Sequence, residues 1–275
     1  MIKICVAGAA GRMGRTVVKE AFNKGFEVVG AVGSPSNVNK GKSLKELGIC
    51  DSDIQLLDSS RLEEAVGDAE VYMTFTTPGA EMINVPKVVT MRKRIILGTT
   101  GFSEEQARKI HEIVSGEVPT VFSPNFSLGI NVLLRLTRFM RVLPPEYDFS
   151  ITEIHHSRKR DAPSGTAKKI CEIVANMRRY SKFVYGREGL TPRTPEELEV
   201  SSLRLGGVPG IHDLIVAGPH EMIRIEHIAF SRSAFAQGAL YAAEWISKQE
   251  EKKIYSMDDV LALADGEHHE QQSRH

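Results

Sequence analysis

The sequence lacks the features that define several protein classes. Its three cysteines, Cys5, Cys50 and Cys171, are far apart and form no C-x-x-C pair, so we expect neither a disulfide framework nor a cysteine zinc site. No apolar run approaches the roughly 18 residues that span a bilayer. The first residues also lack the basic and long apolar regions of a signal peptide. We therefore expect a soluble, cytoplasmic protein.

An excess of charge and an internal repeat are also absent. Lysine plus arginine and aspartate plus glutamate each number 35, so no global field favours nucleic acid or an anionic membrane. The 275 residues, 41% of them hydrophobic, suffice for one large core or two modest ones. These properties favour a small-molecule partner.

The N-terminal part of the chain alternates short apolar runs with amphipathic helical patterns, which is typical of β-α-β units and a parallel sheet. Strands are expected over residues 2–7, 26–32, 70–76, 94–97 and 120–123, and helices over residues 12–23, 62–66, 80–91 and 103–114. The fold class is therefore α/β, with an N-terminal Rossmann-like domain over residues 1–126.

After residue 126 the pattern changes. A long amphipathic helix ends at Pro144 and Pro145, and extended runs dominate from there. Strands are expected over residues 147–155, 199–205, 211–217 and 221–230. They predict a second α+β domain, residues 127–236, with a mostly antiparallel sheet. A C-terminal helix over residues 237–264 is expected to join the first domain, and the polar tail 265–275 to be disordered.

The first strand runs directly into the loop Gly8-Ala9-Ala10-Gly11-Arg12-Met13-Gly14, and a helix follows at once. Glycines let a backbone approach a pyrophosphate closely, and a helix start offers N–H groups and a positive dipole end. The spacing G-x-x-G-x-x-G therefore predicts a dinucleotide site. The plainer alternative is a tight strand-to-helix turn that binds nothing.

The residues at the end of the second expected strand indicate which of NADH and NADPH is preferred. A site for NAD normally places a carboxylate there for the ribose 2′-hydroxyl, but this chain has Gly33, Ser34 and Pro35. With Arg12, Lys40 and Lys42 also expected nearby, NADPH should be accepted and preferred over NADH. Alternatively, the two lysines lie on a solvated loop.

The most informative stretch is residues 153–167, which read Glu-Ile-His-His-Ser-Arg-Lys-Arg-Asp-Ala-Pro-Ser-Gly-Thr-Ala. It leaves a strand, gathers imidazoles and cations, and enters a helix. Positive charge beside a helix N-terminus suits an anionic substrate, such as a dicarboxylate. Because histidine gives up a proton near neutral pH, His155 is the better general acid, while Lys159 suits electrostatic stabilisation or a supporting acid role. No metal is expected, since the cations would repel one.

These residues closely resemble the signature E-x-H-H-x-x-K-x-D-x-P-S-G-T-A of the 4-hydroxy-tetrahydrodipicolinate (dihydrodipicolinate) reductase family. Further matches occur in the family's order at residues 8–14, 98–102 and 123–129, and the resemblance extends to about residue 263. It implies NAD(P)H-dependent reduction in the diaminopimelate route to lysine. It also implies a homotetramer built by the second domain.

The resemblance assigns roles residue by residue. It makes His155 and Lys159 catalytic, and it makes His156, Gly165 and Thr166 contacts of the substrate carboxylates. The cofactor-binding positions it implies are Gly8, Ala9, Ala10, Gly11, Arg12, Met13, Ser34, Phe75, Thr76, Gly98, Thr99, Thr100, Ser123, Pro124, Asn125 and Phe126.

The chain departs from the family pattern at a few positions. Thr74 replaces a common Asp, Ser123-Pro124 a small pair, and Ser34-Pro35 an acidic-basic pair. The last departure leaves the cofactor preference open, with NADPH ahead. Two other functions remain as alternatives: an NADPH-dependent reductase of another amino-acid precursor, and a non-catalytic Rossmann protein that senses NAD(P)H.

Overall fold

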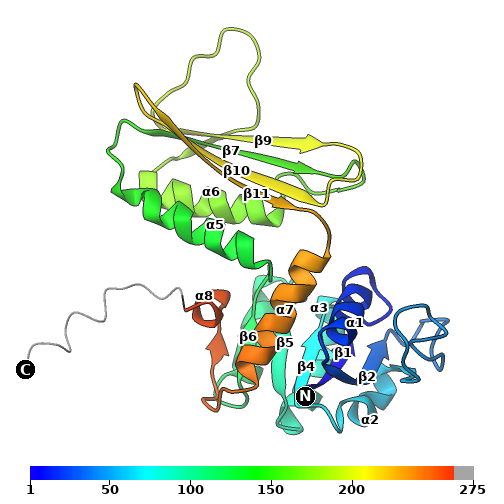
Figure 1. Ribbon diagram of the computed structural model, residues 1–275. Helices are drawn as coiled ribbons and strands as arrows, with labels where there is room; N and C mark the ends of the chain where they lie inside the picture. Colours follow the sequence, from blue (N-terminus) through cyan, green and yellow to red (C-terminus); the bar gives the residue numbers. More distant parts are fainter. Residues whose placement is uncertain (263–275) are drawn as a thin grey trace, which may run out of the picture. The chain divides into compact units, whose positions relative to one another are not determined.

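The computed structural model describes residues 1–262, and the chain forms two compact units (Figure 1). Unit 1 comprises Met1–Ser127 and the chain from Phe235 onward, and unit 2 comprises Leu128–Ala234. The tail expected over residues 265–275 lies outside the described residues. Within residues 1–262, no helix combines the length and apolar character needed to cross a bilayer.

Unit 1 is built on a seven-stranded sheet in the order β12-β6-β5-β4-β1-β2-β3, and every pairing between these strands is parallel. The strands are β1 (Lys3–Ala7), β2 (Glu27–Gly33), β3 (Leu56–Asp58), β4 (Val71–Thr74), β5 (Arg94–Leu97), β6 (Thr120–Phe122) and β12 (Ile254–Tyr255). The helices are α1 (Arg12–Asn23), α2 (Leu62–Val66), α3 (Pro78–Thr90), α4 (Glu104–Val114), α7 (Ser233–Ile246) and α8 (Met257–Val260), with a short 3-10 turn, η1 (Ser59–Arg61).

Helices cover the sheet of unit 1 on both faces, which explains why its central strands are almost wholly apolar. One face packs against α2, α3 and α4, in a core that includes Val85, Val88 and Ile110. The other face is covered by α1 and α7, which lie side by side (Figure 1) and are joined by a hydrogen bond from Gln237 Nε2 to Glu20 Oε2 at 3.1 Å.

The strand order reverses at β1. From β1 the chain adds β2 and β3 on one side, then crosses to the other side for β4, β5 and β6. Ligands of such sheets bind at the carboxyl ends of the strands beside this switch point. The predicted nucleotide loops, after β1, β4, β5 and β6, all start from this edge.

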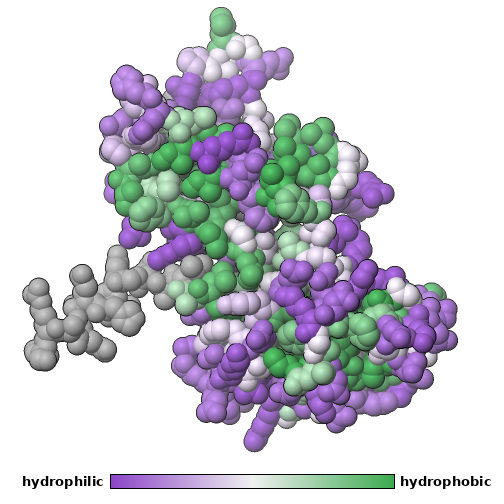
Figure 2. Space-filling model, in the orientation of Figure 1, coloured by the Kyte–Doolittle hydropathy of each residue, from purple (hydrophilic) through white to green (hydrophobic). Residues whose placement is uncertain are grey.

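Unit 2 has a five-stranded sheet in the order β11-β10-β7-β9-β8 with helices packed on one face. Its elements are α5 (Leu128–Phe139), η2 (Met140–Val142), β7 (Asp148–His155), α6 (Gly165–Arg178), β8 (Lys182–Val184), β9 (Glu197–Arg204), β10 (Gly210–Ala217) and β11 (Met222–Ala229). Phe149 and Ile151 of β7 pack in the core against α6. On α5, Val132, Leu136 and Phe139 are exposed, and Figure 2 shows hydrophobic residues gathered over the helices of this unit.

The sheet of unit 2 is mixed. The expected antiparallel pairing holds for β7, β10 and β11, whereas β9 pairs in parallel with β7 and with β8. The reason is the crossover through α6, which returns the chain to the start of β7 before β8 and β9 form. The carboxyl ends of β7 and β9 therefore lie at the same edge.

Candidate active site

An acid–base pair lies at the carboxyl end of β7. Side chains alternate between the faces of this strand, so Glu153 and His155 continue the inner row begun by Phe149 and Ile151. Glu153 is fully buried and His155 is 8% exposed. The Nδ1 atom of His155 forms a short hydrogen bond with Oε2 of Glu153. The apolar row of the strand thus ends in a carboxyl–imidazole pair.

Glu153 is held in its ionised form by its neighbours. Arg204 Nη2 donates to its Oε1 at 2.8 Å, and the backbone N–H of Ser164 donates to the same atom at 3.3 Å. Burial would raise the pKa of Glu153, but the hydrogen bonds from His155 and Arg204 outweigh it and lower the pKa to about 2. A carboxylate only accepts, so Nδ1 of His155 carries the proton between them. Nε2 is left to exchange a proton with substrate.

A second imidazole lies beside this pair. His212 on β10 stands opposite Glu153 in the antiparallel register, and its ring packs edge-on against His155 with centroids 5.1 Å apart. Its Nε2 is hydrogen-bonded to Ser164 Oγ at 3.1 Å. Burial, followed by the influence of His155, lowers the pKa of His212 to about 3, so His212 is neutral near pH 7. The sequence alone left the role of His212 open.

The loop from β7 to α6 carries Lys159. Its Nζ forms an ion pair with Asp161 Oδ1 at 2.9 Å. Burial would raise the pKa of Asp161, but the hydrogen bond from Lys159 outweighs this effect, so the pKa is lowered. Arg204 also donates to the backbone oxygen of Asp161 at 2.7 Å. One arginine therefore ties this loop and Glu153 to the end of β9.

The start of α6 adds the predicted substrate contacts. Ser164 Oγ accepts from the N–H of Ala167 at 3.2 Å and so caps the helix, which places Gly165 and Thr166 in the first turn, at the positive end of the helix dipole. His156 lies in the preceding loop. Burial, then the charges of Arg232 and Arg158, lower the pKa of His156. These groups suit an anionic ligand.

Within residues 1–262, Glu153, His155 and His212 form the one group of potential metal ligands that comes close together, with ligand atoms within 4.8 Å of one another. Both oxygens of Glu153 already accept hydrogen bonds, one of them from the Arg204 guanidinium. A cation here would displace His155 or face that positive charge. We therefore interpret the group as a proton-handling site.

In unit 1, the loop after β1 is tightly packed at its glycines. Gly8 has φ +77°, and a Cβ on it would lie 2.4 Å from the backbone oxygen of Phe75. A Cβ on Gly14 would lie 2.0 Å from the backbone oxygen of Gly8. Residues Ala9 to Met13 lie between these glycines and lead into α1. The backbone is thus packed as closely as a nucleotide-binding turn requires.

The other predicted nucleotide residues lie on neighbouring loops. Phe75 and Thr76 follow β4, residues 98–100 follow β5, and residues 123–126 follow β6. A Cβ on Gly98 would overlap the ring of Phe75 at 2.3 Å, and that ring packs edge-on against Phe126 at 6.3 Å. The structure therefore brings these segments together at the edge where the sheet order reverses.

The loop after β2 is polar and exposed. Ser34 Oγ lies 2.9 Å from Ser36 Oγ, and Lys40 Nζ donates to Pro35 O at 3.2 Å and pairs with Asp58 at 3.5 Å. Arg12 is exposed at the start of α1. Lys40 is therefore anchored to the Ser34–Pro35 turn, whereas Lys42 donates to Asn39 within the loop at 3.3 Å.

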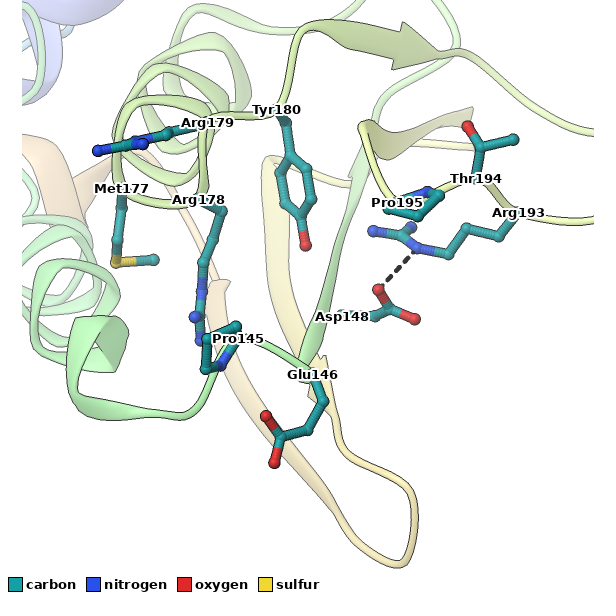
Figure 3. A pocket seen from close by; sticks show the side chains of 10 residues that line it. All are labelled: Pro145, Glu146, Asp148, Met177, Arg178, Arg179, Tyr180, Arg193, Thr194 and Pro195. Atoms are coloured by element: carbon teal, nitrogen blue, oxygen red, sulfur yellow. Dashed lines mark ion pairs between the residues drawn. The ribbon is translucent and has the colours of Figure 1, made fainter.

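A pocket elsewhere in unit 2 contains none of the predicted site residues (Figure 3). Two of its arginines are engaged within the fold. Arg193 pairs with Asp148 at 2.9 Å, and Arg178 lies over the Phe149 ring at 4.6 Å and donates to Pro144 O at 3.1 Å. We assign this pocket no role in the chemistry.

Known proteins are similar to this chain over almost its whole length. A family model described as "Dihydrodipicolinate reductase, N-terminus" matches residues 2–126, and its counterpart for the C-terminus matches residues 129–261. A 4-hydroxy-tetrahydrodipicolinate reductase of Methanosarcina barkeri is 39% identical over 268 residues, covering 96% of this chain and 100% of that protein. One from Aquifex aeolicus is 38% identical over 269 residues, covering 95% and 99%.

Solved structures share the fold. A dipicolinate-bound dihydrodipicolinate reductase from Paenisporosarcina sp. TG-14 has a TM-score of 0.73 at 22% identity, covering 93% of this chain and 97% of that chain. An aspartate semialdehyde dehydrogenase II from Vibrio cholerae has a TM-score of 0.54 at 11% identity, covering 89% and 97%. At these identities the two likenesses concern the fold alone.

Proposed function

This chain belongs to the dihydrodipicolinate reductase family, and from this premise we propose that it reduces 4-hydroxy-tetrahydrodipicolinate to tetrahydrodipicolinate with NAD(P)H, in the diaminopimelate route to lysine. The observation that carries the proposal is the buried Glu153–His155 pair, with Lys159 four residues further on. A Rossmann protein that only sensed NAD(P)H would have no use for an acid beside an anion site. We infer a cytoplasmic location for such a biosynthetic enzyme.

Reduction of 4-hydroxy-tetrahydrodipicolinate requires that the 4-hydroxyl leave as water, and the unsaturated ring formed in this way then takes up a hydride and a proton. The nicotinamide, when bound, supplies the hydride from C4. His155 supplies the proton from Nε2 to the enamine-type carbon that hydride addition leaves, while Glu153 holds the imidazole through Nδ1. Lys159 stabilises negative charge on the substrate, for which it must leave or share Asp161.

The substrate is held by its carboxylates. His156, Gly165 and Thr166 are assigned to these groups, because they stand beside or within the first turn of α6, where a helix attracts anions. His212 stays neutral and so adds no second positive charge to the buried pair. The ring is thereby oriented without trapping the product.

An assay tests the function directly. NADPH oxidation should be seen with the product of dihydrodipicolinate synthase, and not with aspartate- or homoserine-type precursors offered separately. Turnover of one of those precursors alone would reject the assignment in favour of another amino-acid reductase. Nucleotide binding without any turnover would favour the sensor.

We further propose a preference for NADPH over NADH. The loop after β2 presents hydroxyls and Lys40 in place of the carboxylate typical of NAD sites. The anchoring of Lys40 to Pro35 O and Asp58 holds its charge beside Ser34. A 2′-phosphate would gain charge-assisted hydrogen bonds there that NADH cannot make.

Lys40→Ala is therefore expected to lower kcat/KM for NADPH by about tenfold, the loss of roughly one charge-assisted hydrogen bond, and to leave NADH kinetics nearly unchanged. Lys45→Ala is the control, since that exposed lysine pairs with Asp51 at 2.7 Å. Steady-state kinetics with both cofactors measure the effect. An equal fall in kcat/KM with NADPH and with NADH would exclude a role for Lys40 in binding the 2′-phosphate.

We also propose that unit 2 assembles a homotetramer through the outer face of its sheet. Helices cover only the inner face, and the outer rows expose Leu203, Met222 and Ile228 and partly expose Ile154 and Ile215. Apolar residues on an uncovered sheet face favour association with a second copy.

Light scattering of the wild type should give the mass of four chains, and Ile215→Lys should shift it to smaller species, because a charge is then forced into the packed sheet faces. The exposed Lys45→Ala variant should keep the wild-type mass. A monomeric wild type at micromolar concentration would refute the assembly.

A further inference from the structure

We propose that Glu81 is a positioning residue that holds two nucleotide-binding loops, Phe75–Thr76 and Gly98–Thr100, in a single arrangement. Glu81 lies in the first turn of α3 and is fully buried. Its Oε1 accepts hydrogen bonds from the hydroxyls of Thr74, Thr76 and Thr99. This proposal rests on the assignment of these loops to the nucleotide.

The three hydroxyls come from two strand ends, Thr74 and Thr76 from β4 and Thr99 from β5, so the carboxyl group joins elements that are otherwise separate in sequence. Thr99 Oγ1 donates to Glu81 at 2.8 Å and accepts from the backbone N–H of Thr76 at 2.9 Å. The N–H of Gly98 donates to Thr74 O at 2.9 Å. Glu81 is the centre of a network that fixes the end of β4 against the end of β5.

Burying the carboxyl group of Glu81 costs free energy of folding, which argues for a role beyond packing. No basic side chain within residues 1–262 pairs with Glu81, and its Oε2 is buried without a hydrogen-bond partner. Burial raises the pKa of Glu81, against the effect of the three hydroxyls. A leucine would fill the same inner position of α3 without that penalty.

The loops tied by Glu81 are also packed tightly against each other. Gly98 leaves no room for a Cβ beside the ring of Phe75, so a shift of one loop moves the other. Without Glu81 the hydroxyls of Thr76 and Thr99 would lose their shared acceptor and turn elsewhere. Nucleotide affinity should fall, because the loops would have to be ordered at the moment of binding.

The test compares Glu81→Leu with Glu81→Gln. The leucine variant should raise the Kd and KM for NADPH by about tenfold or more, from the loss of several hydrogen bonds, with kcat at saturating NADPH and the substrate KM nearly unchanged. The glutamine variant should bind almost normally, since its carbonyl oxygen still accepts. Thr120→Val, another buried polar residue of unit 1, at the start of β6, controls for general destabilisation.

A second pair of variants keeps the proposal testable if Glu81→Leu does not fold. The hydroxyl of Thr74 donates to Glu81, and Thr74 is assigned no nucleotide contact. Thr74→Val should lower the affinity for NADPH and Thr74→Ser should retain it, and Glu81→Leu should add little to Thr74→Val because the two act in one network. Wild-type affinity in Glu81→Leu, or equal losses in Glu81→Leu and Glu81→Gln, would overturn the proposal. Failure of the wild type to bind either nucleotide would instead reject the proposed function, and this inference with it.

Discussion

Replacing His155 with alanine is expected to lower kcat by about 100- to 10,000-fold, the range that a positioned general acid contributes. The Kd for NADPH should change little, because the residues proposed to bind the nucleotide belong to unit 1 and His155 to unit 2. Glu153→Gln should cause a smaller loss of kcat, since the amide keeps the shape of the side chain but no longer fixes the proton on Nδ1. Stopped-flow kinetics measure kcat, and nucleotide titration measures the Kd for NADPH.

Lys159→Ala should also reduce kcat strongly, and the double variant with His155→Ala should be little worse than the more impaired single variant, because groups that act in one step are not additive. His220→Ala, on an exposed turn of unit 2, is the control and should turn over normally. Unchanged turnover in the double variant would defeat the catalytic roles given to both residues.

Gly14→Ala is expected to raise the Kd for NADPH by about 100-fold or more. The new Cβ would lie 2.0 Å from the backbone oxygen of Gly8, so the phosphate loop must move by more than an ångström, and displacements of that size cost about two orders of magnitude. Fluorescence titration of NADPH measures the loss, with circular dichroism to verify folding.

Gly79→Ala is the matched control for that substitution. Gly79 lies in the first turn of α3, and nothing lies within 4 Å of a Cβ placed on it. Its affinity for NADPH should equal that of the wild type, and its stability should rise slightly because alanine favours the helix. Equal affinities in the two variants would show that the loop after β1 does not bind the nucleotide.

Much of unit 1 could be predicted because each element carries its own periodic pattern. The helix expected over residues 12–23 is α1, and the strand expected over residues 94–97 is β5. The strands β3 and β8 were not predicted, since three residues are too few for an alternating pattern. Pairing defines such short strands instead, as when Ile254 and Tyr255 of β12 align with Thr120 and Val121. The helix expected over residues 237–264 was wrong beyond Ile246, because α7 ends there and β12 and α8 follow.

The site was predictable only where its residues lie close in sequence. His155 and Lys159 belong to one motif, but His212 meets Glu153 through the pairing of β7 with β10, which no local pattern reveals. A signal for Glu153 was present nonetheless. Phe149 and Ile151 place every second residue of β7 on the core face, and a carboxylate in that row, two positions before a histidine, indicates a buried pair.

The hydrogen-bond network of Glu81 also joins residues that lie far apart in sequence, so it could not be predicted. Residues 81, 85 and 88 share one face of α3, with Val85 and Val88 in the core, so an acid at position 81 is out of place on an apolar stripe. That anomaly is visible in the sequence. Its cause is not, because the threonines reach Glu81 from the ends of two strands, β4 and β5, that the chain brings together only in the fold.

The two residues proposed as catalytic differ in how firmly the fold holds them. His155 ends β7, an interior strand bonded on both sides and aligned with Arg204 of β9, a location where backbone amides exchange hydrogen slowly. Lys159 follows on a connecting loop, tethered by one ion pair and one backbone hydrogen bond to His156. The sheet thus fixes the position of the proposed acid, while substitutions in the loop around Lys159 should leave that acid in place only where the backbone oxygen of Asp161 still accepts from Arg204, which also holds Glu153.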